Sequence, residues 1–209
     1  MNRLGIIKRG SLLLSLFLLF LFPSSLFANF DPIVANDGIM PKKEVDKIRE
    51  MGAELYEKTK VPVFVAAVAD LNSTKPADLL EPIKREHKDF ALLYFSKNPT
   101  AVNIFASENV KKLMDIEQIL SPLPWRGTIK PIMSPAFSKN EDIKLSVAIL
   151  NGYADMVDQI AESRGVKLAS SIGSGSKDSF KLIRWIFYAI LLFFLGQYIY
   201  TKFRRRRGE

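Results

Sequence analysis

Two apolar segments, one at each end of the chain and each flanked by basic residues, constrain the fold more than any other feature. The chain has 209 residues and a net charge of +8, yet residues 29–177 carry no net charge. Three of the excess positive charges lie in residues 1–28 and five in residues 178–209. Basic residues beside apolar segments are typical of membrane topology, whereas a nucleic-acid-binding module carries its basic residues on the folded part. We therefore expect a membrane protein with no nucleic-acid partner.

Residues 1–28 have the layout of a secretory signal peptide. A basic start is followed by the uncharged apolar run Ser11–Phe22 and by a segment that ends at Ala28, where we expect cleavage. The alternative is an uncleaved anchor, for which the apolar run is short.

Residues 182–201 are predicted to form a transmembrane helix, because about 20 apolar residues cross a bilayer. Trp185 near its start matches the usual interfacial aromatic, and the basic tail 202–209 marks the cytoplasmic side. The tail has a second possible role in binding anionic lipid head groups. These features predict a single-pass protein of the bacterial inner membrane, with its domain in the periplasm and its C-terminus in the cytoplasm.

The residue types that are missing exclude several kinds of chemistry. There is no cysteine, which excludes disulfides, CxxC redox motifs and cysteine zinc sites. His87 is the only histidine, so no multi-histidine metal site can form and no Ser-His-Asp arrangement is defensible. His87 ends a charged helix in the run EHKD, and we expect it to be a solvated surface residue.

The exported part, residues 29–167, is predicted to be one α/β domain. Apolar spacings of three and four predict helices, and apolar runs rich in β-branched and aromatic residues predict strands. The expected helices span residues 41–59, 77–87 and 141–164, with short ones in 108–120, and the expected strands span 61–68, 90–95 and 101–105.

The segments that join these elements have their own signatures. Residues 121–135 contain four prolines and are predicted to form a long irregular loop, which is often functional. Ser138–Glu141 matches a capping box before the last helix, on which Ile143 is expected to face inward. Residues 168–181, which include the run ASSIGSGS at 169–176, are predicted to be a flexible linker to the membrane.

The exported part resembles the TPM domain family. The matching pieces are Asn36–Pro41 before the first helix, Thr59–Val65 after it, the hairpin over 90–105 and the long last helix. The resemblance implies a small sheet sandwiched by helices. It also implies one of two functions, since some members are described as divalent-metal-binding acid phosphatases and others as assembly or repair factors for membrane complexes. The family's usual Gly-rich stretch after the hairpin is replaced here by Ala106–Asp115, which has no glycine and puts phosphatase activity in doubt.

Four residues at three places in the sequence are candidate site residues. Asp37 is a candidate ligand for calcium or magnesium, with Asp31, Asp70 or Asp115 as further ligands, and the alternative is an aspartate that helps the chain turn into a helix. Trp125 and Arg126 are candidate partner-binding residues, because both types are favoured in binding hot spots, and the alternative is a tryptophan that plugs the core edge.

Asn72 is a candidate glycosylation site. It lies in Asp70-Leu-Asn-Ser-Thr74, which fits both the ordinary sequon and the stricter bacterial form with an acid two residues before the asparagine. The hypothesis applies only to a host with an oligosaccharyl transferase, and an unmodified Asn72 peptide from such a host would refute it.

These observations predict a membrane-anchored exported domain that binds partners and helps assemble or maintain a membrane-protein complex without catalysis. The alternative is a divalent-metal-dependent acid phosphatase of the TPM type.

Overall fold

The computed structural model describes residues 30–72, 74–134, 140–173 and 188–197. The chain divides into two units, residues 1–30 and 31–209, and the folded domain belongs to the second. The predicted signal peptide lies outside the described residues, and so does half of the predicted span, of which 188–197 are helical. Within the described part of the chain, no helix is both long and apolar enough to cross a bilayer.

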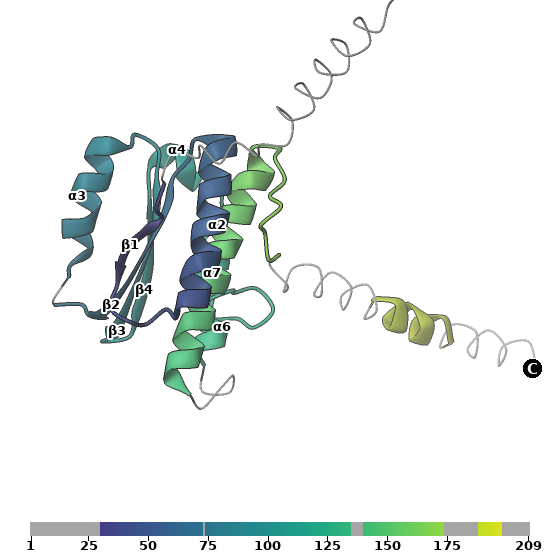
Figure 1. Cartoon of the computed structure of the whole chain (residues 1–209). Helices are drawn as coiled ribbons and strands as arrows, with labels where there is room; N and C mark the ends of the chain where they lie inside the picture. Colours follow the sequence, from purple (N-terminus) through teal and green to yellow (C-terminus); the bar gives the residue numbers. More distant parts are fainter. Residues whose placement is uncertain (1–29, 73, 135–139, 174–187, 198–209) are drawn as a thin grey trace, which may run out of the picture. The chain divides into compact units, whose positions relative to one another are not determined.

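A four-stranded mixed sheet forms the centre of the domain (Figure 1). Its strands are β1 (Ile33–Asn36), β2 (Val63–Asp70), β3 (Ala91–Asn98) and β4 (Ala101–Ala106), in the spatial order β1-β2-β3-β4. The first three are parallel, and β4 pairs with β3 as an antiparallel hairpin. The first six residues of β2 are all buried, as its continuous apolar run predicts. The α/β prediction is confirmed.

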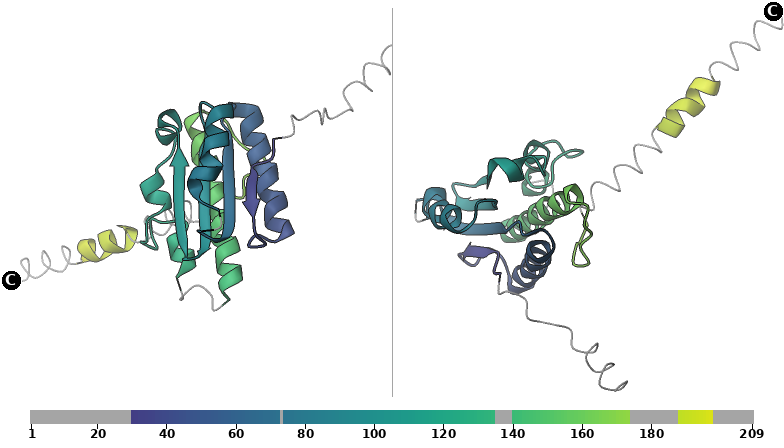
Figure 2. Two further views of the ribbon diagram at one scale, coloured as in Figure 1. Left: turned by 90° about the vertical axis from the view of Figure 1, so that its left-hand side faces the viewer. Right: turned by 90° about the horizontal axis from the view of Figure 1, so that it is seen from above.

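Helices cover both faces of this sheet. Helices α2 (Lys42–Thr59) and α7 (Glu141–Ser163) pack side by side on one face, and α3 (Pro76–Glu86) lies on the other (Figures 1 and 2). The side chains of Val65, Leu93 and Phe95 meet the apolar sides of α2 and α7 in the main core. On that face the buried Tyr153 hydroxyl donates a hydrogen bond of 2.8 Å to the carbonyl of Val63, which ties α7 to β2.

Three short helices complete the domain: α4 (Glu108–Lys111), α5 (Ile116–Ile119) and α6 (Lys130–Met133). The first two confirm the prediction for residues 108–120. The third, α6, was not predicted, because the four prolines of residues 121–135 indicate an irregular loop. Pro131 nevertheless fits at the first turn of this helix, where a proline is tolerated. The described part of 121–135 is therefore more ordered than its composition suggests.

Two predictions about α7 were wrong in detail. Ile143 is 52% exposed, because burial along the helix begins only at Lys144 and the first turn extends past the core. The helix N-cap is Asn140, whose Oδ1 accepts a hydrogen bond of 3.2 Å from the Ile143 backbone N–H. Ser138, the predicted cap, lies outside the described residues.

His87 lies at the surface but is less exposed than its charged neighbours suggest. Its ring lies 5.5 Å from the Phe64 ring and 6.4 Å from the Tyr56 ring, centre to centre, and only 23% of its side chain is exposed. Local sequence could not reveal this, because both aromatic neighbours come from other elements, α2 and β2.

The predicted flexible linker was also wrong over its first residues. Ala169 and Ser170 donate backbone hydrogen bonds to the carboxylate of Glu54 on α2, and Ser170 is buried. The described chain up to Gly173 is thus part of the domain, and residues 174–181 of the predicted linker lie outside the description.

Candidate partner-binding loop

Five consecutive exposed residues, Pro122–Arg126, form a loop that carries two exposed large apolar side chains. They lie between the buried Ser121 and the buried run Gly127–Ile129. Trp125 is 65% exposed and Leu123 is 41% exposed. Trp125 does not plug the core edge, so that alternative is wrong. A tryptophan exposed to this extent presents a large apolar surface that a partner can cover.

Hydrogen bonds close the loop at its base. The backbone N–H groups of Arg126 and Gly127 donate to the carbonyl of Leu123 at 3.0 and 2.7 Å. The Leu123 N–H in turn donates to the Ser121 hydroxyl at 3.3 Å. A Cβ atom added to Gly127 would lie 1.7 Å from the carbonyl oxygen of Ser121, so only glycine fits where the two ends of the loop meet.

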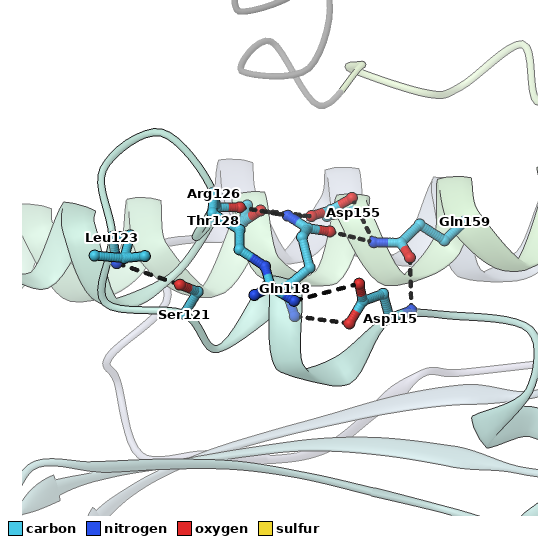
Figure 3. A network of polar contacts seen from close by, with 8 residues as sticks. All are labelled: Asp115, Gln118, Ser121, Leu123, Arg126, Thr128, Asp155 and Gln159. Atoms are coloured by element: carbon cyan, nitrogen blue, oxygen red, sulfur yellow. Dashed lines mark hydrogen bonds and ion pairs between the residues drawn. The ribbon is translucent and has the colours of Figure 1, made fainter.

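A polar network beneath the loop fastens it to α7 (Figure 3). The carboxyl group of Asp155 is fully buried and accepts hydrogen bonds from the Thr128 hydroxyl at 2.5 Å and from the Gln159 amide at 2.9 Å. The side-chain amide of Gln118 on α5 contacts the loop directly. It donates a hydrogen bond of 2.7 Å to the backbone carbonyl of Arg126. The loop is therefore held by side chains of both α5 and α7.

The same network reaches back to the start of α5. The Gln159 amide nitrogen donates to the Gln118 side-chain oxygen at 2.9 Å, while the Gln159 oxygen accepts from the Asp115 N–H at 2.8 Å. Asp115 also caps α5 by accepting from the Gln118 N–H at 2.8 Å. Because buried polar groups are costly when unpaired, these linked bonds favour one arrangement of the segment that carries the loop.

The cation of the loop has an anionic neighbour. The Arg126 guanidinium lies 3.8 Å from a carboxylate oxygen of Asp115, and about half of each side chain is exposed. An exposed pair of this kind adds little stability, about 0–1 kcal/mol. It does cancel the local charge, so the exposed loop presents an apolar surface beside a neutral ion pair.

Sequence reasoning identified Trp125 and Arg126 but missed Gln118, Asp155 and Gln159. A signal was present in the last helix, where Asp155 and Gln159 stand four residues apart in a mostly apolar stretch. Residues at this spacing lie on the same face of a helix. A buried face with two polar side chains needs partners from another segment, and here α5 and the loop supply them.

Asp37 lies at the carboxyl end of β1, beside the end of β2. Its side chain is exposed and accepts a hydrogen bond of 2.8 Å from the Ala69 N–H. Asp70 lies at the same sheet edge, and burial together with the charges of Asp37 and Asp70 raises the pKa of the Tyr94 phenol. Two of the four candidate acids thus lie near one another, at the sheet edge where parallel α/β sheets commonly bind ligands.

The other two candidate acids make contacts elsewhere. Asp31 forms an ion pair of 2.9 Å with Arg49, and Asp115 belongs to the network under the loop. Among the residues that the structure describes, no three histidine, aspartate or glutamate side chains gather in a way that would hold a metal ion. The assignment of Asp37 as a calcium or magnesium ligand stays a prediction.

Asn72 lies in the turn after β2 and is exposed, as a modified asparagine must be. Its backbone N–H donates a hydrogen bond of 2.7 Å to the Asp70 carboxylate. The glycosylation hypothesis stays a prediction, conditional on the host.

Comparison with protein-family models and with curated proteins finds no match to this chain. The resemblance to the TPM family therefore also stays a prediction from the sequence.

Proposed function

We propose that the protein is a membrane-anchored exported domain that binds a partner through the loop Pro122–Arg126 and so helps assemble or maintain a membrane complex, without catalysis. The single observation that carries the proposal is the exposed Trp125, presented on a loop whose base is fastened to α7. The apolar ends of the chain and their basic flanks support the membrane anchor.

Rigidity is what makes this loop a good binding element. Ordering a mobile loop on binding costs free energy, and a loop that is already ordered avoids that cost. Two features hold the base of this loop in place. The buried Asp155 carboxyl group bonds to Thr128, and Gly127 packs closely against the Ser121 carbonyl. Tryptophan and arginine are among the residues most often found at binding hot spots.

Co-purification from the cells that encode the chain tests the proposal. The full chain is extracted in mild detergent as wild type, as Trp125→Ala and as Ile143→Ala. Ile143 is a matched control, because it is another large, exposed apolar side chain of the same domain.

We expect wild type and Ile143→Ala to retain the same membrane proteins. Loss of a hot-spot residue costs about 2 kcal/mol or more, so Trp125→Ala should retain them at about 30-fold lower affinity. Equal recovery with Trp125→Ala, or no co-purifying protein with the wild type, would contradict the proposal.

A further inference from the structure

The chain after α7 folds back onto the domain as a strap, defined here as residues Val166–Gly173. Val166 and Leu168 pack against the main core, and the Val166 N–H donates to the carbonyl of Ala161. Ser170 is 95% buried, with only 5% of its surface exposed. The strap thus packs on the domain through Val166, Leu168 and Ser170, although its composition is that of a flexible linker.

Glu54 on α2 holds the strap against the domain through hydrogen bonds, and we call this contact the clamp. Its carboxylate accepts hydrogen bonds from the backbone N–H groups of Ala169 and Ser170 at 2.7 and 2.8 Å, and from the Ser170 hydroxyl at 2.5 Å. Lys58 lies 2.6 Å from the same carboxylate and also donates to the carbonyl of Lys167. These donors outweigh partial burial and lower the pKa of Glu54 to about 2.

The strap and the Trp125 loop are attached to the same turn of α7. The Ser171 hydroxyl donates to the Asp158 carboxylate at 2.9 Å, three residues after the Asp155 carboxyl group that holds the loop through Thr128. The end of the strap and the loop accordingly lie on the side of the domain away from α3 (Figures 1 and 2). The chain therefore leaves the domain near the turn of α7 that holds the base of the loop.

Strap docking shortens the connection to the predicted span. Only the eight residues 174–181 separate Gly173 from the span at Leu182, and a fully extended chain of that length reaches about 27 Å. With the strap released, the sixteen residues 166–181 would reach about 54 Å.

We propose that the strap, clamped by Glu54, holds the Pro122–Arg126 loop at the level of the membrane surface, where it docks on an apolar patch of a membrane protein beside the chain's own anchor. This inference rests on the proposed function and on the predicted span.

The chemistry of the loop favours a protein over a lipid surface. Binding to anionic head groups depends on unpaired basic residues, whereas Arg126 is paired with Asp115 next to Leu123 and Trp125. An apolar patch of a protein is complementary to the side chains of Leu123 and Trp125. Such a patch needs no excess of acidic residues, because the charge of Arg126 is already neutralised by Asp115.

Energy transfer from Trp125 to dansyl-labelled lipid head groups measures the height of the loop above the bilayer. The full chain is reconstituted in phosphatidylcholine vesicles with Trp185→Phe, which leaves Trp125 as the only tryptophan. We compare this background with Glu54→Ala, with the control Glu57→Ala on the same helix, and with eight Gly/Ser residues inserted after Gly173. The insertion doubles the free connection without altering the domain.

We expect strong transfer in the background and in Glu57→Ala, and a drop of at least twofold in both Glu54→Ala and the insertion variant. Weak transfer in the background, or equal transfer in all four proteins, would overturn the inference and leave the proposed function standing. If Glu54→Ala does not fold, the insertion variant alone decides.

Photo-crosslinking in native membranes identifies the class of partner. A photoreactive amino acid replaces Leu123 in the full chain, with and without Trp125→Ala. An adduct with an integral membrane protein that is lost with Trp125→Ala supports the inference. A lipid adduct overturns the partner class, and an adduct with a soluble protein overturns the membrane-level docking. No adduct of any kind counts against the proposed function itself.

Discussion

Replacing Thr128 with valine tests whether the network under the loop holds it in place. Thr128 is buried and donates the shortest hydrogen bond of the network, 2.5 Å, to Asp155. Valine keeps the shape and removes the hydroxyl, so the buried carboxyl group loses a donor. Removing one partner of a buried hydrogen bond costs about 1–3 kcal/mol, and we expect a loss of about 2 kcal/mol in the free energy of unfolding.

Thermal unfolding of the full chain in mild detergent, followed by circular dichroism, measures this loss. A change of about 2 kcal/mol lowers the Tm of a domain of this size by roughly 4–8 °C. The control is Thr100→Val, which removes the hydroxyl of an exposed threonine that bonds only the carbonyl of Lys97 at 2.9 Å. We expect it to change the Tm by no more than about 2 °C.

A second readout separates the loop from the whole domain. In the Trp185→Phe background, the fluorescence anisotropy of Trp125 reports how far the loop moves. We expect Thr128→Val to lower the anisotropy at temperatures where the domain is still folded. Unchanged anisotropy together with a Tm loss below about 2 °C would show that the hydrogen bond from Thr128 to Asp155 does not order the loop.

Three further predictions concern Gly127, Glu54 and Asp37. Gly127→Ala should cost about 1–3 kcal/mol of stability, because its methyl group would overlap the carbonyl of Ser121, and a melting curve like that of wild type would contradict this. The pKa of Glu54 is lowered from 4.5 to about 2, so its contribution of up to about 3 kcal/mol is present above pH 4.5 and is lost as the pH falls towards 2. A wild-type loss of stability over that range that Glu54→Gln does not reduce would contradict this. Asp37→Asn should leave phosphate-ester hydrolysis unchanged, with or without calcium or magnesium, whereas metal-dependent turnover that the variant abolishes would establish the phosphatase alternative.

The sequence predicts the elements of the fold well where burial follows local pattern. The apolar run at the start of β2 and the periodic spacings of α2 and α7 are strong signals, and all three elements form as expected. Ile143 fits the periodicity of α7 but is exposed, because the pattern does not show where the core ends.

Contacts between distant segments explain what the sequence could not predict. The serine and glycine content of the strap predicts a flexible linker, yet its partner Glu54 lies more than a hundred residues earlier in the chain. The loop candidates Trp125 and Arg126 were visible as residue types. Their support by Gln118, Asp155 and Gln159 depends on how α5 and α7 come together, which no local pattern records.

The abundance of assembled membrane complexes in the cells that encode the chain shows whether the Trp125 loop supports their assembly. Membranes of a deletion strain, and of strains complemented with wild type, Trp125→Ala or Ile143→Ala, are resolved by native electrophoresis and quantified by mass spectrometry. We expect at least one membrane complex to decline in the deletion strain and to recover with wild type and Ile143→Ala but not with Trp125→Ala. Full recovery with Trp125→Ala, or no complex that changes on deletion, would contradict it.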